Sequence, residues 1–574
     1  MSRHNLFETV SRRSFLRSAS AAACLSQAPL LLHAASRPSP PVEVLRQPDG
    51  LRMFAGGESS APRQLVRSGD RWTGGGVEVT VAPGTDRSVI TLHAPKAAVE
   101  RVHLRWNGSV AEGTAVLGDA WERSYGDLGW RPVEAERCLP WYCMTCDGDV
   151  THGYGVAVGA GSFAFWQVDE RGVSLWLDAR NGGRAAQLGD RVVVLATVVQ
   201  HRGARGEGAF AATKALCGAM AAGVSLPRVR GRHTLRPMYG SNDWYYAYGQ
   251  NTPDGILRDA DLMAELRPAG GAEPFTVIDD GYQDRRRFPD MARLAEGIGK
   301  RGVTPGVWVR PLRAAAGTKA GLLLPEARWG ARRDRAQELA FDPTIPEARE
   351  TVLAVMREAV GWGYELIKHD FTTFELLGQW GFEMGASPTL PGWNFADRTK
   401  TNAEIVTELY RDLRKAAGED RVMLGCNTMG HLGVGIFDAQ RTGDDVSGRS
   451  WERTRRMGVN TLAFRLPQNG RFFLTDADCV PVTKDVPWTM TRQWLDAVSR
   501  SGTVLLISPE PGAVGPEQKS ALREAFARSM AASAGAAEEP ADWMESRTPE
   551  HWTGSGSGQR YVWTEAEGET PFPA

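Results

Sequence analysis

The chain has 574 residues, of which 42% are hydrophobic, 9% aromatic and 24% charged, and 67 lysines and arginines nearly balance 68 aspartates and glutamates. This is the composition of a globular protein, and the length exceeds that of one ordinary domain. A net charge of −1 argues against nucleic acid or an anionic membrane as the main partner.

The first segment, residues 1–35, has the pattern of an export signal. Ser11–Arg17 contains paired arginines, and a mildly apolar run follows up to Leu32, before the small residues around Ala35. This pattern resembles a twin-arginine signal with cleavage near Ala35. No apolar run approaches the roughly 20 residues that a membrane helix needs. We therefore expect a protein exported by the twin-arginine route, periplasmic or secreted, without a membrane span.

The next region is rich in short strands. In Gly76–Val81 and Val102–Trp106 apolar and polar residues alternate, and glycine, proline and aspartate turns separate such segments. Strands at this density without helices between them predict an antiparallel β-sandwich over residues 36–226. A helical pattern at Gly208–Met220 closes the domain, and a basic linker, Pro227–Arg232, follows it.

Six of the seven cysteines would remain after removal of the signal. Proteins on the twin-arginine route fold in a reducing cytoplasm, so this even number need not indicate disulfides. Cys143 and Cys146 have a spacing found in zinc sites, with Cys138 and His152 nearby, but no second pair of ligands follows. We expect neither a metal ion nor a cofactor.

From residue 233 to residue 511, strand, loop and helix alternate. The helical patterns include Pro346–Trp362 and Ala403–Ala416, and Thr252 with Pro253 predicts a helix start. Eight apolar stretches are predicted to be strands: Leu235–Tyr239, Phe275–Asp279, Val303–Arg310, Glu365–Asp370, Val422–Asn427, Gly435–Arg441, Phe472–Asp476 and Val504–Ser508. Eight strands with crossovers over about 280 residues predict a (β/α)8 barrel. The alternative, an open doubly wound sheet, lacks a Gly-x-Gly-x-x-Gly after the first strand.

After the barrel, residues 512–574 carry a weaker pattern. Glu517–Ala534 is predicted to be a helix and Arg560–Thr564 a single strand. These two elements are too few for an independent sandwich. We expect a segment that either packs on the barrel or is the truncated remainder of a longer one.

Charged residues gather where predicted strands end. Lys368 and Asp370 have the same strand parity, so both point into the barrel mouth; a structural salt bridge is the alternative for this pair alone. The whole set is Asp279, Asp280, Lys368, Asp370, Arg441, Asp444, Asp445 and Asp476. So many like charges are costly unless they serve a function, which is either hard-metal binding or glycoside hydrolysis. The cations among the acids favour glycoside hydrolysis.

These residues resemble the retaining α-galactosidase clan, glycoside hydrolase family 36 and its neighbour family 27. The resemblance extends over Asp279–Gly281, Gly302–Trp308 and Phe341–Thr344, and Pro140–Gly155 resembles the N-terminal sandwich of that clan. It implies an exo-acting retaining α-glycosidase, most simply an α-galactosidase. Such an enzyme removes terminal α-linked galactose-type residues from an oligosaccharide or glycoconjugate through a covalent glycosyl-aspartate intermediate.

The resemblance also implies a role for each residue. Asp370 is implied to be the nucleophile, Lys368 to bind sugar hydroxyls, and Asp279 and Asp280 to grip the O4 and O6 edge of the ring. Further substrate contacts are expected from Trp244, Trp308, Cys426, Asn427, Arg441, Asp444 and Asp476.

Two neighbouring residues compete for the role of acid/base. The family pattern with an arginine four residues before the acid selects Asp445, because Arg441 has this spacing. A variant with a small residue directly before the acid would select Asp444. Asp445 is the preferred assignment, and it is expected to be less solvated than the nucleophile Asp370 because it must hold a proton.

The sequence differs from the family pattern at positions that are expected to contact the glycone. Leu424–Thr428 stands where galactosidases carry a glutamate, or a cysteine with a glycine run, against the sugar's 2-position. Asn427, with Cys426 and Thr428, is expected to set the preference there, because an amide both donates and accepts. An N-acetylgalactosamine or L-arabinopyranose glycone is therefore an alternative. A second alternative is a catalytically silent carbohydrate-binding protein on the same fold. The sequence does not predict the oligomeric state.

Overall fold

The computed structural model describes residues 40–56, 61–225, 238–332, 338–554 and 558–564. The predicted export signal and the predicted linker Pro227–Arg232 lie outside these residues. Within the described ranges, every helix is too short or too polar to cross a bilayer.

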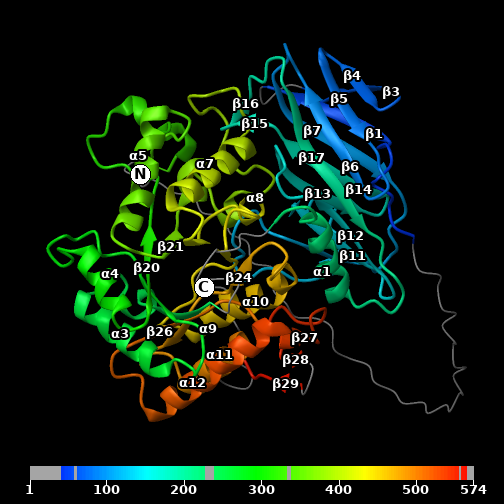
Figure 1. The fold of residues 1–574 in the computed structure, drawn as a ribbon. Helices are drawn as coiled ribbons and strands as arrows, with labels where there is room; N and C mark the ends of the chain where they lie inside the picture. Colours follow the sequence, from blue (N-terminus) through cyan, green and yellow to red (C-terminus); the bar gives the residue numbers. More distant parts are fainter. Residues whose placement is uncertain (1–39, 57–60, 226–237, 333–337, 555–557, 565–574) are drawn as a thin grey trace, which may run out of the picture. The chain divides into compact units, whose positions relative to one another are not determined.

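The first half of the chain forms two antiparallel sheets, drawn in blue and cyan in Figure 1. One has the order β10 (Leu139–Pro140), β13 (Phe163–Asp169), β14 (Gly172–Asp178), β7 (Val99–Asn107), β1 (Gly50–Ala55) and β2 (Arg63–Gln64). The other has the order β3 (Val66–Ser68), β4 (Arg71–Gly74), β5 (Val77–Ala82), β6 (Arg87–His93), β17 (Val192–His201), β12 (Thr151–Val156), β11 (Tyr142–Cys146), β8 (Ala115–Gly118) and β9 (Arg131–Pro132). A small hairpin, β15 (Arg180–Asn181) and β16 (Arg184–Ala185), stands apart. The predicted sandwich is confirmed.

The apolar residues that alternate with polar ones in the sequence are the residues that are buried in the strands. In β5, Val77, Val79 and Val81 are buried while the residues between them are half-buried. This is the period-two pattern of a strand with one face on a core. Helix α1 (Ala209–Met220), which the sequence predicted almost to the residue, packs on β12 and β17.

The second half forms a parallel sheet that curls into a barrel. Its order is β24 (Leu474–Asp476), β23 (Ala439–Arg441), β22 (Val422–Gly425), β21 (Leu366–His369), β20 (Thr304–Val309), β19 (Phe275–Ile278), β18 (Tyr239–Asn242), β26 (Leu505–Pro509) and β25 (Val480–Val482). The two ends meet, because the amide of Val504, just before β26, donates to the carbonyl of Thr475 in β24 over 3.0 Å. The predicted barrel is confirmed.

Nine strands fill eight positions because the seventh is interrupted. The sequence predicted one strand, Phe472–Asp476, whereas the structure has β24, a break, and then β25, which pairs with β26. Asp478 lies in the break with a φ of 80°, in the left-handed region that aspartate tolerates better than most residues. This conformation ends β24 and turns the Asp478 carboxylate inward.

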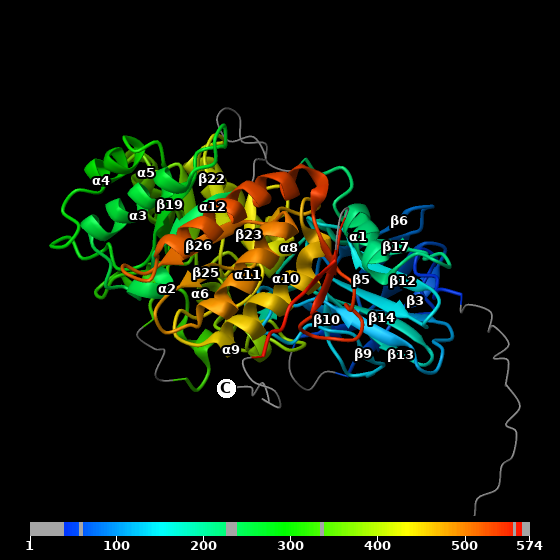
Figure 2. The same cartoon turned by 90° about the horizontal axis from the view of Figure 1, so that it is seen from below.

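Helices follow the strands as a barrel requires: α2 (Trp244–Ala247), α3 (Pro253–Leu266), α4 (Met291–Gly299), α5 (Pro346–Gly361), α6 (Thr372–Leu377), α7 (Asn402–Ala417), α8 (Gly430–Gly433), α9 (Trp451–Thr454), α10 (Asn460–Arg465), α11 (Trp488–Ser501) and α12 (Pro516–Ala531). The predicted cap of α3 is present, since the Thr252 hydroxyl accepts from the amide of Gly255 over 3.1 Å. Figure 2 shows α11 and α12 running side by side, and they pack on one another.

Two further predicted strands begin later in the structure than the sequence predicts. The first, Leu235–Tyr239, is β18, which begins at Tyr239; residues 235–237 lie outside the described part of the chain. The sixth, Gly435–Arg441, is shortened to β23, because a turn that follows helix α8 and contains Gly435 (φ 80°) takes its first residues.

The tail is a small sheet rather than a single strand. β27 (Glu539–Pro540), β28 (His551–Thr553) and β29 (Gln559–Arg560) pair antiparallel. The predicted strand Arg560–Thr564 therefore survives only at its first residue. The indole of Trp451 in α9 donates to the carbonyl of Trp563 over 2.7 Å. The tail thus packs on the barrel, one of the two expectations.

One loop of the sandwich reaches the barrel mouth. This sandwich loop, residues 119–125, follows β8, and its Ser124 pairs with the chain after β23. The Ser124 amide donates to the Thr442 carbonyl over 2.9 Å, and the Asp444 amide donates to the Ser124 carbonyl over 2.8 Å. Arg465 binds Asp119 at 2.8 Å and fixes the start of the loop.

Candidate active site

A cavity of about 380 Å³ opens where the barrel strands end. Nine residues that the sequence singled out line it: Trp244, Asp279, Asp280, Trp308, Lys368, Asp370, Cys426, Asp444 and Asp445. The strand ends are therefore brought together as predicted. Arg441, Asn427 and Asp476 do not line the cavity. Six lining residues were missed: Arg123, Tyr125, Tyr245, Phe371, Trp380 and Arg453.

Asp370 follows β21, and three donors hold its carboxylate. The Trp308 indole donates to Oδ2 over 3.0 Å. The amides of Phe371 and Asn427 donate to Oδ1 over 2.7 and 2.8 Å. Phe371 adopts a φ of 63°, so this geometry uses an uncommon backbone conformation for a non-glycine residue. The carboxylate is oriented before any substrate arrives.

The charges around Asp370 keep it ionised. Burial alone raises the pKa of its carboxyl, but the positive charges of Arg123 and Lys368 and the hydrogen bond from Trp308 outweigh that effect. The pKa therefore lies below the ordinary value of an aspartate. At 9% exposure this ionised carboxylate has little water around it, an environment in which a carboxylate can act as a nucleophile.

Lys368 and the two aspartates after β19 form one wall. The Lys368 ammonium donates to Asp279 Oδ2 over 2.7 Å, and the Asn242 amide donates to the same oxygen over 2.8 Å. Burial would lower the pKa of Lys368, but the charge of Asp279 raises it well above its ordinary value. Asp280 is half-buried, and burial together with the Asp279 charge raises its pKa. This wall offers fixed donors and acceptors for hydroxyl groups.

The two candidate acids lie on the opposite flank, between arginines. Asp445 contacts Arg441 at 2.9 Å and Arg123 at 3.4 Å, both through Oδ1. Asp444 contacts Arg123 at 3.3 Å through Oδ1 and Arg453 at 2.8 Å through Oδ2. The side chain of Asp445 is 41% exposed and that of Asp444 18%. The expectation that Asp445 is less solvated than Asp370 is wrong, because Asp445 lies in a loop at the rim.

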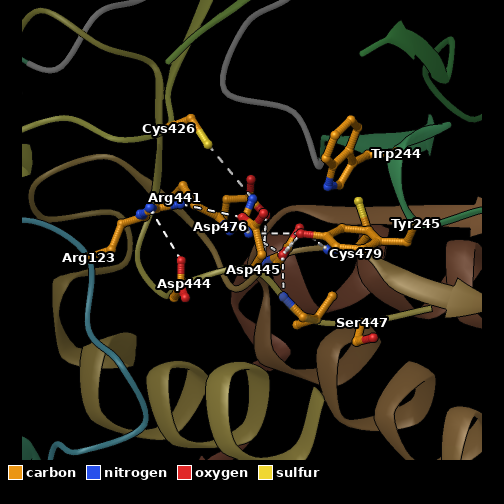
Figure 3. A network of polar contacts seen from close by, with 12 residues as sticks. Arg123, Trp244, Tyr245, Cys426, Arg441, Asp444, Asp445, Ser447, Asp476 and Cys479 are labelled. Carbon is orange, nitrogen blue, oxygen red and sulfur yellow. Dashed lines mark hydrogen bonds and ion pairs between the residues drawn. The ribbon is translucent and has the colours of Figure 1, made fainter. Parts of the chain in front are cut away.

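A buried network holds Asp445 from behind (Figure 3). The Arg441 guanidinium, itself buried, donates to the Tyr245 hydroxyl over 3.0 Å and to the Asp478 carboxylate. The same carboxylate accepts from the amide of Val446, directly after Asp445, over 2.9 Å. Asp478 thus fixes both the arginine beside Asp445 and the backbone that follows it.

Arg441, Asn427 and Asp476 support the cavity rather than lining it. The Asn427 amide donates to Glu122 over 2.7 Å and accepts from the Phe374 amide over 3.1 Å. Asp476 accepts from the amide of Asp478 over 2.9 Å. At the predicted 2-position wall only Cys426 lines the cavity, and burial raises the pKa of its thiol well above the ordinary value. A glutamate at 427 would meet Glu122 rather than a sugar.

Arg123, delivered by the sandwich loop, is the main residue that the sequence did not reveal. Its guanidinium contacts Asp444 and Asp445, and its charge acts on Asp370. It also lies 6.0 Å from the ring centroid of Tyr125 and 5.9 Å from that of Trp380. Glu122 balances it at 3.4 Å. One buried cation therefore interacts with the carboxylates of Asp370, Asp444 and Asp445.

Removing this cation is expected to shift the pH profile of activity. In Arg123→Met the pKa of Asp370 is expected to rise, since Arg123 lowers it, so the Asp370 carboxyl is protonated up to a higher pH. The acidic limb of log kcat/KM against pH is expected to move to higher pH. Arg123→Lys keeps the positive charge, so its pH profile should lie close to that of the wild type. Arg453→Met is the matched control, because Arg453 binds the carboxylate of Asp444 and only the backbone carbonyl of Asp445; an equal shift there would contradict the assignment.

No group of three or more His, Cys, Asp or Glu side chains among the described residues is arranged to hold a metal ion. Cys138, Cys143 and Cys146, whose spacing raised the zinc alternative, are free thiols.

No family model matches the sequence. Solved structures do match the fold. An α-galactosidase from Thermus thermophilus superimposes with a TM-score of 0.58 at 18% identity, over 89% of this chain and 99% of that one. A family 36 α-galactosidase from Geobacillus stearothermophilus gives 0.52 at 13% identity, over 84% and 73%. An α-galactosidase from Lactobacillus brevis gives 0.52 at 12%, over 87% and 72%. The sandwich, the barrel and their order along the chain are thus those of the glycoside hydrolase family 36 α-galactosidases, whose fold this protein has.

Proposed function

We propose that this protein is an exo-acting retaining α-galactosidase that hydrolyses terminal α-linked galactose-type residues of oligosaccharides or glycoconjugates. The observation that carries the proposal is the asymmetry of one cavity. An ionised, hydrogen-bonded carboxylate, Asp370, lies on one side, and a second carboxylate, Asp445, lies at the rim on another. Two carboxyl groups in different environments are what glycoside hydrolysis needs.

The reaction has two steps. Asp370 forms a bond to the anomeric carbon while the glycosidic C–O bond breaks, and Asp445 transfers its proton to the departing oxygen. A water molecule then gives a proton back to Asp445 and attacks the anomeric carbon, which releases Asp370 and the sugar. Two displacements on the same carbon retain its configuration.

The contacts of the two rim acids support Asp445 as the proton donor. Arginines contact both oxygens of Asp444, which holds that side chain in place and leaves neither oxygen without an arginine contact. Both arginine contacts of Asp445 fall on Oδ1, so Oδ2 can carry a proton toward the cavity. Arg441 contacts Asp478 as well as Asp445, so it is shared between the two carboxylates.

The remaining walls fit a hexose. Asp279, Asp280 and Lys368 present charged groups to hydroxyls, whereas Trp244 and Trp308 offer flat apolar faces to the ring carbons. The fold comparison supports the same substrate class. The Thermus thermophilus α-galactosidase was solved with p-nitrophenyl α-D-galactopyranoside and with stachyose.

A panel of p-nitrophenyl glycosides tests the proposal. The protein without residues 1–35 is expected to hydrolyse the α-D-galactoside fastest, with the β-D-galactoside as the stereochemical control. Faster hydrolysis of the α-N-acetylgalactosaminide or the β-L-arabinopyranoside would identify a different preferred sugar and would keep the proposed catalytic mechanism. No hydrolysis of any member, with sugar binding retained in calorimetry, would identify a silent carbohydrate-binding protein.

A further inference from the structure

A second cavity, of about 150 Å³, adjoins the proposed catalytic cavity. The two share Arg123 and Tyr125, which therefore form a common wall. The other walls of the second cavity come from the sandwich loop and from the barrel segment around Gly381–Gly385. Nothing in the proposed chemistry so far uses this space.

The contacts of Arg123 show on which side of the catalytic cavity the second one lies. Arg123 contacts both Asp444 and Asp445 (Figure 3 shows the bond to Asp444), whereas Lys368 and Asp279 form a wall of their own. The common wall is therefore on the flank of the proposed acid. The bond to be broken must lie next to that acid, so the leaving group departs on this flank.

An exposed aromatic ring stands at the second cavity. Phe382 is 69% exposed, and in the described part of the chain no other phenylalanine or tryptophan has an exposed side chain. Its ring centroid lies 5.5 Å from that of Tyr125, which belongs to both cavities. The amide of Gly381 donates to Glu122 over 3.1 Å and ties the Phe382 segment to the sandwich loop.

Glu122, Tyr125 and Trp121, three polar groups around this ring, are already paired. The Glu122 carboxylate accepts from the Tyr125 hydroxyl over 2.5 Å and from the Asn427 amide over 2.7 Å. The Trp121 indole donates to the Gly385 carbonyl over 2.7 Å. What remains for a ligand is mostly aromatic face, which favours stacking over recognition of particular hydroxyls.

We propose that Phe382, Tyr125 and the adjoining cavity form a leaving-group subsite, in which the sugar or aryl ring attached to the scissile oxygen stacks. The inference rests on the proposed function, because Asp445 identifies the leaving-group flank. Stacking without specific hydrogen bonds makes the subsite tolerant of different rings. It gives no advantage to a leaving group that has no ring.

Substrates that share the glycone and differ in the leaving group test the subsite. Raffinose and p-nitrophenyl α-D-galactopyranoside carry a ring there, whereas α-D-galactosyl fluoride carries none. In Phe382→Ala the ratio of kcat/KM for raffinose to kcat/KM for the fluoride is expected to fall about 3- to 10-fold. Phe382→Tyr keeps the ring and should keep the ratio. The change is expected mainly in KM for raffinose, since the ring does not touch the reacting atoms.

Three results would overturn the subsite. A ratio unchanged in Phe382→Ala would mean that the ring does not contact the leaving group. An equal loss on all three substrates, or a change of oligomeric state in size-exclusion chromatography, would assign the ring to the fold or to a contact between copies. These failures differ from failure of the proposed function, in which the wild-type protein would not hydrolyse even the fluoride.

Discussion

Asp370→Ala is expected to lose turnover on every substrate, by roughly 10⁴-fold or more, because in the proposed mechanism Asp370 is the group that forms the glycosyl intermediate. Loss of a nucleophile does not depend on the leaving group, so raffinose, the p-nitrophenyl galactoside and the fluoride should be affected alike. Azide, a small anion, can enter the space left by the carboxylate and attack the anomeric carbon. The expected product is a galactosyl azide of inverted configuration, identified by NMR.

Asp370→Asn is the matched control for that rescue. The amide keeps the size of the side chain and fills the space, so azide should not restore activity to this variant. Activity in Asp370→Ala above roughly a tenth of wild type would remove Asp370 from the role of nucleophile. A first-formed sugar that is inverted at its anomeric carbon in the wild-type reaction would contradict the retaining mechanism itself.

Asp445→Ala should show a large effect that depends on the leaving group. A p-nitrophenolate leaves without much protonation, whereas a sugar alkoxide needs a proton, so raffinose hydrolysis is expected to fall by roughly 10²–10⁴-fold. The first step with the p-nitrophenyl galactoside should be nearly spared, which a stopped-flow burst of nitrophenolate can measure. Slow hydrolysis of the accumulated intermediate would then limit the steady state.

Asp444→Ala is the comparison that decides between the neighbours. Asp444 is bound by arginines through both oxygens, so its removal is expected to weaken binding equally for all leaving groups. If the leaving-group dependence is found in Asp444→Ala and not in Asp445→Ala, the roles of the two residues are exchanged.

The barrel mouth was predictable from sequence because local rules determine it. Strand parity placed Lys368 and Asp370 on one side, and parallel strands end at the same rim, so Asp279, Asp280, Asp444 and Asp445 had to meet there. The structure brings all six to one cavity. This inference needed no knowledge of how the sandwich and the barrel pack.

Residues whose placement depends on tertiary packing were missed or misplaced. Arg123 lies 322 residues from Asp445 in sequence, and no local pattern marks it. Asn427 was assigned to a strand, but β22 ends at Gly425 and the turn directs the amide to Glu122. The predicted strand Phe472–Asp476 ends where β24 does, but nothing in its pattern indicates the left-handed conformation of Asp478 two residues later.

Because the sandwich loop docks on the barrel mouth, we expect the pocket to form late in folding. The charge balance around Asp370 is complete only when Arg123 has arrived from the other half of the chain, and contacts between such distant segments form slowly. A barrel produced without the sandwich would keep its strand-end carboxylates but would lack Arg123, the cation that interacts with them. Enzymatic activity therefore reports the assembly of the two halves, and under mild denaturant it should vanish before the helical circular dichroism of the barrel does.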